Sequence, residues 1–153
     1  GITPERRGRW CRPVDPHFLR QLNTRKPTSL EGIARLWYDD DDWEDCAHQH
    51  YHRSRYRLLN LHSLSQGKGI EFRAFNATLN TDEVLADIQL CMALSARAKA
   101  VKTASPARPE TDNPKHTFRC LLLRIGMSGD AFKTAREQLI CRLPGNSAWR
   151  MAS

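Results

Sequence analysis

The segment from Gly69 to Phe75 alternates in character residue by residue, and this alternation constrains the fold more than any other feature of the chain. Successive side chains of a β-strand point to opposite faces, so the pattern predicts a strand. One face would carry Ile70, Phe72 and Ala74, and the other Glu71, Arg73 and Phe75. Because residues two apart on a strand are separated by about 7 Å, we expect Glu71 and Arg73 to project side by side.

The preceding residues 53–62 (RSRYRLLNLH) also have strand character. Glycine in the connection, at Gly67, suits a hairpin, so the two runs are predicted to pair as antiparallel strands. Arg55 and Arg57 would then share one face of the first strand and add positive potential beside the second.

Short helices are predicted before this hairpin. One is expected at Pro16–Leu22, within an otherwise irregular N-terminal stretch rich in Arg and Pro. Thr28 and Glu31 fit a capping box, in which each side chain bonds the other's backbone amide, for a helix that ends near Tyr38.

A long helix is predicted after the hairpin, with Asn80 as its N-cap and its end near Val101. Its expected buried face consists of Val84, Leu85, Ile88, Cys91, Met92 and Ser95. Two further helices, at 115–125 and 130–142, are expected to pack together through Leu121, Leu122, Ile125, Phe132, Leu139 and Ile140. The fold class is therefore α+β, with an antiparallel sheet, helices packed on one face of it, and a helical C-terminus.

The composition is that of a globular protein, with 40% hydrophobic and 27% charged residues among 153. The sequence has no apolar run long enough to span a membrane and no signal-peptide pattern at its start. Its five cysteines include no CxxC pair, so we interpret them as reduced thiols of a cytoplasmic protein.

The net charge of +7 suits anionic partners, and most of the basic residues are arginines, whose planar fork binds carboxylate or phosphate. One interpretation is a basic nucleic-acid-binding module. Its phosphate-binding residues would be Arg6, Arg7, Arg9, Arg12, Arg53, Arg55 and Arg57, and its base-stacking residues Trp10, Tyr51 or Tyr56. The sequence contains no RNP, KH, zinc-finger or helix-turn-helix pattern.

Residues 46–52 (CAHQHYH) would place Cys46 and three histidines on one face if they were extended. Such an arrangement could hold zinc, but adjacent positions of one strand rarely satisfy a tetrahedral site. Alternatively, His52 lies at the edge of an anion site formed by the arginines that follow it.

Glu71 and Arg73 permit two interpretations. A solvated ion pair on a strand would contribute only about 0–1 kcal/mol to stability. Phosphoryl and acyl-phosphate chemistry uses the same two groups, because carboxylates hold Mg²⁺ and guanidinium groups take up charge on transferring oxygens.

Residues 55–61 (RYRLLNL), followed by 69–76 (GIEFRAFN) and a helix, resemble the signature of the amidoligase family. That family is similar to glutamine synthetase and to glutamate–cysteine ligase. The flanking residues 10–13 (WCRP), 118–126 (FRCLLLRIG) and 145–150 (GNSAWR) also resemble family elements, so the resemblance covers nearly the whole chain.

The resemblance implies a glutamine synthetase-like fold and an ATP-dependent carboxylate–amine ligase that uses Mg²⁺. Its substrates would be small-molecule or peptide carboxylates and amines. It implies that Glu71 binds the metal and that Arg73 and Arg55 are catalytic. From their places beside these residues, we further expect Arg57 and His52 to contact the cofactor. Residues 1–102 would belong to the catalytic domain, 103–114 would form a linker or loop, and 115–153 would complete the domain.

The chain departs from the family in its acidic residues, because the family supplies most of its metal-binding carboxylates from strands upstream of this motif. The acidic run at 39–42 does not replace them, since four consecutive acids cannot all face one metal cluster. We therefore expect the chain, which begins at Gly1, to be the C-terminal portion of a longer enzyme. A ligase remnant without activity is a further interpretation.

Overall fold

The computed structural model describes residues 2–39, 42–107 and 109–149, and these divide into two compact units at Asn76. The acidic run at 39–42 lies partly outside this range, because residues 40 and 41 are not described.

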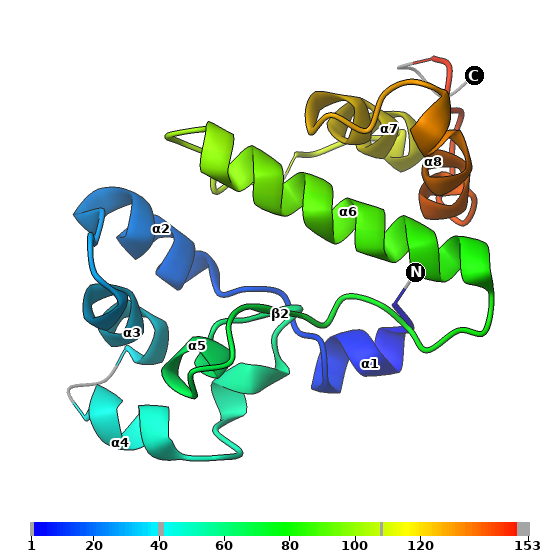
Figure 1. Cartoon of the computed structure of the whole chain (residues 1–153). Coiled ribbons are helices and arrows are strands. Elements are labelled where there is room, and N and C mark those ends of the chain that lie inside the picture. The colour runs from blue at the N-terminus through cyan, green and yellow to red at the C-terminus, as the bar shows by residue number, and fades with distance from the viewer. Residues whose placement is uncertain (1, 40–41, 108, 150–153) are drawn as a thin grey trace. The chain divides into compact units, whose positions relative to one another are not determined.

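The N-terminal unit, Ile2–Asn76, contains five α-helices, one 3₁₀ helix and two short strands among its described residues. Figure 1 shows α2, α3 and α4 at one end of this unit and α1 at the other. In chain order the elements are α1 (Pro4–Arg9), α2 (Pro16–Arg25), α3 (Leu30–Tyr38), α4 (Trp43–His48), η1 (Arg53–Tyr56), β1 (Leu59–Asn60), α5 (His62–Ser65) and β2 (Glu71–Phe72).

Strands β1 and β2 pair antiparallel, with Leu59 opposite Phe72 and Asn60 opposite Glu71. The α+β class and the antiparallel pairing are thus confirmed. The strands are much shorter than predicted, and α5 lies in their connection in place of a tight turn. The predicted apolar face is also wrong at Ile70, which is 54% exposed.

The helices of this unit bury a small aromatic core. Phe18 from α2 packs edge-to-face against Trp37 from α3, with ring centroids 5.1 Å apart. Tyr38 and Ala47 complete the buried cluster, which explains why residues 43–48 form a helix. The zinc interpretation required residues 46–52 to be extended, whereas residues 46–48 belong to α4.

Helix α3 ends at Tyr38 as predicted, but its N-cap is Ser29, whose hydroxyl accepts the amide hydrogen of Gly32. The expected capping role of Thr28 is wrong by one residue. The helix begins at Leu30, so the N-cap position, directly before the first helical residue, is that of Ser29.

The C-terminal unit, Ala77–Ser153, has α6 (Thr81–Ala100), α7 (Pro114–Arg124), η2 (Asp130–Phe132) and α8 (Lys133–Ile140). Asn80 caps α6 as predicted, accepting from the amides of Asp82 and Glu83. Helix α8 packs along α6, as Figure 1 shows.

The expected buried face of α6 is wrong. Ala86 and Leu90 are buried, whereas four residues of the predicted face are exposed by 41–67%: Val84, Leu85, Ile88 and Met92. Apolar residues occur on several sides of this helix, so the position of the neighbouring helix determines which side is covered. Of the residues predicted to join the last two helices, Leu122 and Ile125 are buried and Leu121 is 40% exposed.

Candidate functional site

Glu71 and Arg73 lie side by side on and just after β2, as the alternation predicted. Arg73 Nη1 is 2.9 Å from Glu71 Oε1 in an ion pair. The Arg73 side chain is 19% exposed and that of Glu71 is 46% exposed, so the carboxylate remains accessible to a ligand.

The backbone of Arg73 is held by the N-terminal segment of the unit. Its amide donates to the carbonyl of Leu58 at 2.8 Å, and the Leu58 amide donates to the carbonyl of Arg12 at 2.8 Å. The buried thiol of Cys11 donates to the Arg73 carbonyl at 2.9 Å and accepts from Arg6 Nη2 at 3.1 Å. Segments far apart in the sequence therefore fix the position of this arginine.

Asn60, on β1 opposite Glu71, contacts the second oxygen of that carboxylate. Its Nδ2 donates to Glu71 Oε2 at 2.6 Å, and the residue is only 3% exposed. Sequence reasoning assigned Asn60 no role. The available signal was a polar residue inside the apolar run LLNL, at the position that the hairpin pairs with Glu71.

Arg55 does not lie on a strand, so the prediction that it shares a strand face with Arg57 is wrong. It belongs to η1, and its Nη1 donates to the carbonyl of His50 at 3.1 Å. Its guanidinium lies 5.7 Å from the centroid of the Tyr56 ring, and that of Arg73 lies at the same distance from this ring. Tyr56 is thus a shared neighbour of the two predicted catalytic arginines.

Arg57 instead contacts the start of α2. Its Nη2 lies 3.5 Å from Asp15 Oδ2, and its guanidinium lies 5.1 Å from the Trp37 ring centroid. The pKa of Asp15 is lowered, first by its hydrogen bond from the His17 amide and then by the Arg57 charge. This environment ties Arg57 to the packing of the N-terminal segment.

His52 precedes η1 and caps it, because its Nδ1 accepts from the Ser54 amide at 3.3 Å. Ser54 in turn accepts from Trp37 Nε1 at 2.9 Å through its hydroxyl. Side-chain bonds to nearby backbone compete with strand pairing, which gives a physical reason for the 3₁₀ helix here.

His52 also packs in an aromatic group with Tyr38 and His62, at ring distances of 5.1 and 5.7 Å. His62 is buried, and its Nε2 lies 2.9 Å from the carbonyl of Gln49. A carbonyl only accepts, so Nε2 carries the hydrogen and Nδ1 accepts from the Tyr38 hydroxyl at 2.6 Å. Burial lowers the pKa of His62 and raises the pKa of Tyr38.

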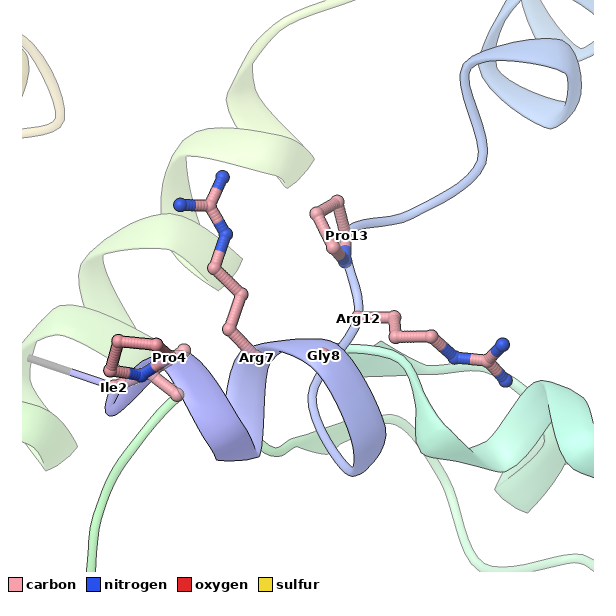
Figure 2. Close-up of a pocket in the computed structure, with 6 residues that line it drawn as sticks. All are labelled: Ile2, Pro4, Arg7, Gly8, Arg12 and Pro13. Atoms are coloured by element: carbon pink, nitrogen blue, oxygen red, sulfur yellow. The ribbon is translucent and has the colours of Figure 1, made fainter.

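Two hollows among the described residues of the N-terminal unit lie away from the Glu71–Arg73 pair. One, of about 510 Å³, is lined by residues of α1 and the segment after it, and Figure 2 shows Arg7 and Arg12 at it with their guanidinium groups pointing apart. The other, of about 300 Å³, lies among α3, α4 and residues 61–65 and is mostly apolar. Neither is lined by Glu71 or Arg73.

Comparison with known protein families identifies the class of this chain. Residues 1–95 match the family model described as "Putative amidoligase enzyme". The chain belongs to this amidoligase family. The match includes the whole N-terminal unit, with Glu71 and Arg73, and most of α6. Neither the curated proteins nor the solved structures include a match.

Membership of the amidoligase family supports a ligase function in general terms. Within the described ranges, no helix has both the length and the apolar character required to cross a bilayer.

Glu71 does not belong to a ready-made cluster of metal-binding side chains among the described residues. No group of three or more His, Cys, Asp or Glu side chains capable of holding a metal occurs among the residues that the structure describes. Magnesium commonly uses one or two protein carboxylates and completes its shell with water and substrate phosphates. A single accessible carboxylate therefore fits magnesium that arrives with a nucleotide, and does not fit an all-protein metal site.

Proposed function

We propose that this chain contributes Glu71 and Arg73 to the active site of an ATP-dependent carboxylate–amine ligase. The supporting observation is the 2.9 Å pair itself, in a chain that belongs to the amidoligase family. By resemblance to glutamine synthetase, these two positions hold a metal-binding carboxylate and a phosphate-contacting arginine.

The proposed reaction has two steps. The γ-phosphoryl group of ATP is transferred to a carboxylate oxygen of the first substrate, and ADP leaves. The amine nitrogen of the second substrate then attacks the carbonyl carbon of this acyl phosphate. The bond from that carbon to the phosphate oxygen breaks, inorganic phosphate leaves, the nitrogen loses a proton, and an amide or isopeptide bond results.

Arg73 suits stabilisation of the charge that develops on the transferring phosphoryl oxygens. Its Nε is buried and has no hydrogen-bond partner among the described residues, and Arg6 Nε shares this property. Buried donors are ordinarily paired, so a bound anion would satisfy a donor that the protein leaves open.

Glu71 would hold Mg²⁺, which would neutralise charge on the nucleotide phosphates when bound. Arg55, near the same tyrosine as Arg73, would bind a phosphate or the substrate carboxylate. The contacts to ATP predicted for Arg57 and His52 stay predictions. In the structure Arg57 is paired with Asp15, and His52 caps η1.

The proposal includes an upstream segment that supplies further metal-binding carboxylates, since Glu71 alone provides one ligand. It also includes small-molecule or peptide substrates and a cytoplasmic location. These parts rest on the family resemblance and on the cysteine content of the chain.

Hydroxylamine provides a test that does not require the natural amine, because it converts acyl phosphates to hydroxamates. The full-length protein is incubated with Mg·ATP, hydroxylamine and a panel of carboxylates, and hydroxamate and ADP are measured. We expect hydroxamate with at least one carboxylate and its loss in Glu71→Gln. Glu31→Gln is the matched control, because Glu31 forms an equally short ion pair with Arg35 on α3. An unchanged rate in Glu71→Gln would refute the assignment.

A further inference from the structure

The carboxylate of Glu71 lies between two donors that come from different segments. Arg73 Nη1 reaches Oε1 at 2.9 Å, and Asn60 Nδ2 reaches Oε2 at 2.6 Å. The strand register places Asn60 directly opposite Glu71, and Asn60 is 3% exposed whereas the carboxylate is accessible. The buried Asn60 therefore contacts Oε2 of Glu71, the proposed metal ligand.

The orientation of the Asn60 amide follows from its second contact. Asn60 Oδ1 accepts the backbone hydrogen of His62 at 2.9 Å. A flipped amide would place an NH₂ group against that N–H and a carbonyl oxygen against the carboxylate of Glu71, so both contacts would become repulsive. The NH₂ group must face Glu71.

His62 is itself fixed at both ring nitrogens. Nε2 donates to the carbonyl of Gln49 at 2.9 Å, and Nδ1 accepts from Tyr38 at 2.6 Å. The backbone amide that locks Asn60 thus belongs to a residue that α3 and the segment after α4 hold in place. A chain of buried hydrogen bonds extends from the core to the Glu71 carboxylate.

We propose that Asn60 is a positioning residue for Glu71: it orients the carboxylate so that the accessible lone pairs face a metal-bound nucleotide. This inference rests on the proposed function of Glu71. Metal-binding carboxylates and imidazoles are commonly held by a second layer of hydrogen bonds, and loss of such a partner costs about 10–100-fold in metal affinity or activity.

If Asn60 had a purely structural role, Asn60→Asp would affect Mg·ATP binding no more than another variant that weakens the same unit. If Asn60 positions Glu71, Asn60→Asp would weaken that binding. Aspartate has nearly the same shape and can still accept the His62 amide hydrogen, but it cannot donate to Glu71 and places a like charge beside it. The control is Phe18→Leu, which weakens the aromatic core of the same unit without contacting Glu71.

The first measurement concerns the contact itself and needs no ligand. We expect the side-chain NH₂ signals of Asn60 in a ¹⁵N–¹H spectrum to shift in Glu71→Gln and to stay in place in Glu31→Gln. Signals that do not respond to Glu71→Gln would overturn the inference.

The second measurement is the affinity for Mg·ATP by isothermal titration, with the full-length protein. We expect Asn60→Asp to weaken binding by about 10–100-fold, as a lost partner of a metal ligand does, and Phe18→Leu to change it less than about twofold. If Glu71→Gln weakens binding but Asn60→Asp behaves like Phe18→Leu, the positioning role is overturned and the proposed function stands. If Glu71→Gln binds like the unmodified protein, the metal-binding role of Glu71 is overturned, and the role of Asn60 with it.

Discussion

His62 accepts the hydroxyl hydrogen of Tyr38 at 2.6 Å through a ring nitrogen that carries no hydrogen, because its other nitrogen donates to the Gln49 carbonyl. Both residues are buried. This contact joins the end of α3 to the start of α5, and through the His62 amide it joins the core to Asn60 and Glu71.

Tyr38→Phe should lower the free energy of unfolding by about 1–3 kcal/mol, because it leaves a buried acceptor on His62 without its donor. Urea denaturation followed by circular dichroism measures the change. A shift in midpoint with an unchanged slope would show lost stability with the same unfolded state. No change in midpoint would contradict the buried contact.

The pH dependence of stability should carry the signature of His62. Burial lowers its pKa, the nearby charges of Arg55 and His50 lower it further, and the bond to the Gln49 carbonyl acts in the opposite direction. Near pH 6.5 the unfolded chain therefore binds a proton at this site to a greater extent than the folded protein does. The stabilisation is therefore complete above about pH 6.5 and is lost as the pH falls toward the folded pKa.

Unfolding experiments between about pH 7.5 and 5.5 test this prediction. We expect the free energy of unfolding to decrease on acidification in the unmodified protein and to depend less on pH in His62→Asn. An identical slope in the two proteins would show that His62 does not carry this dependence.

The Glu71–Arg73 pair could be predicted because it depends on a local property, the alternation of side chains along a strand. The 3₁₀ helix at residues 53–56 could not be predicted in this way. It depends on Ser54, whose hydroxyl accepts from Trp37, a residue 17 positions away that only the folded chain brings close. The involvement of Asn60 was hidden for a related reason, since it requires the exact pairing of β1 with β2.

Helix α6 shows the same division between local and tertiary information. Its N-cap was predictable, because Asn80 bonds amides two and three residues away. Its buried face was not, because Val84 and Ile88 are as apolar as Leu90, yet only Leu90 is covered.

Asn80→Ala should lower the free energy of unfolding by about 1 kcal/mol, since two amide hydrogens in the first turn of α6 lose their acceptor. Ser95→Ala is the matched control on the same helix. Its hydroxyl is exposed and bonds only the Cys91 carbonyl, so we expect a change within about 0.5 kcal/mol. Equal effects in the two variants would contradict the capping role.

Arg55 and Arg57 should differ in what their substitution affects. Arg55→Gln should raise KM for Mg·ATP or for the carboxylate in the hydroxamate assay, because its guanidinium lies near the same ring as that of Arg73. Arg57→Gln should lower the free energy of unfolding by about 1 kcal/mol through its lost contacts to Asp15 and Trp37. A raised KM for Mg·ATP in Arg57→Gln, with stability unchanged, would instead support the predicted cofactor contact.

Binding to single-stranded DNA tests the alternative function. A guanidinium lies over one face of two of the proposed stacking rings: Arg9 lies 4.7 Å from the Trp10 ring centroid, and Arg55 lies 5.2 Å from that of Tyr51. Base stacking on an aromatic side chain contributes about 1–3 kcal/mol per base, and a ring face already occupied by a guanidinium offers less of it.

We therefore expect only non-specific binding at physiological salt, with a Kd of about 10⁻⁴ to 10⁻⁶ M, measured by fluorescence anisotropy over a salt series. Tyr51→Ala should leave this affinity unchanged, because weak binding through phosphate contacts does not depend on stacking. Sub-micromolar binding that falls steeply with salt and weakens in Tyr51→Ala would favour the nucleic-acid-binding module.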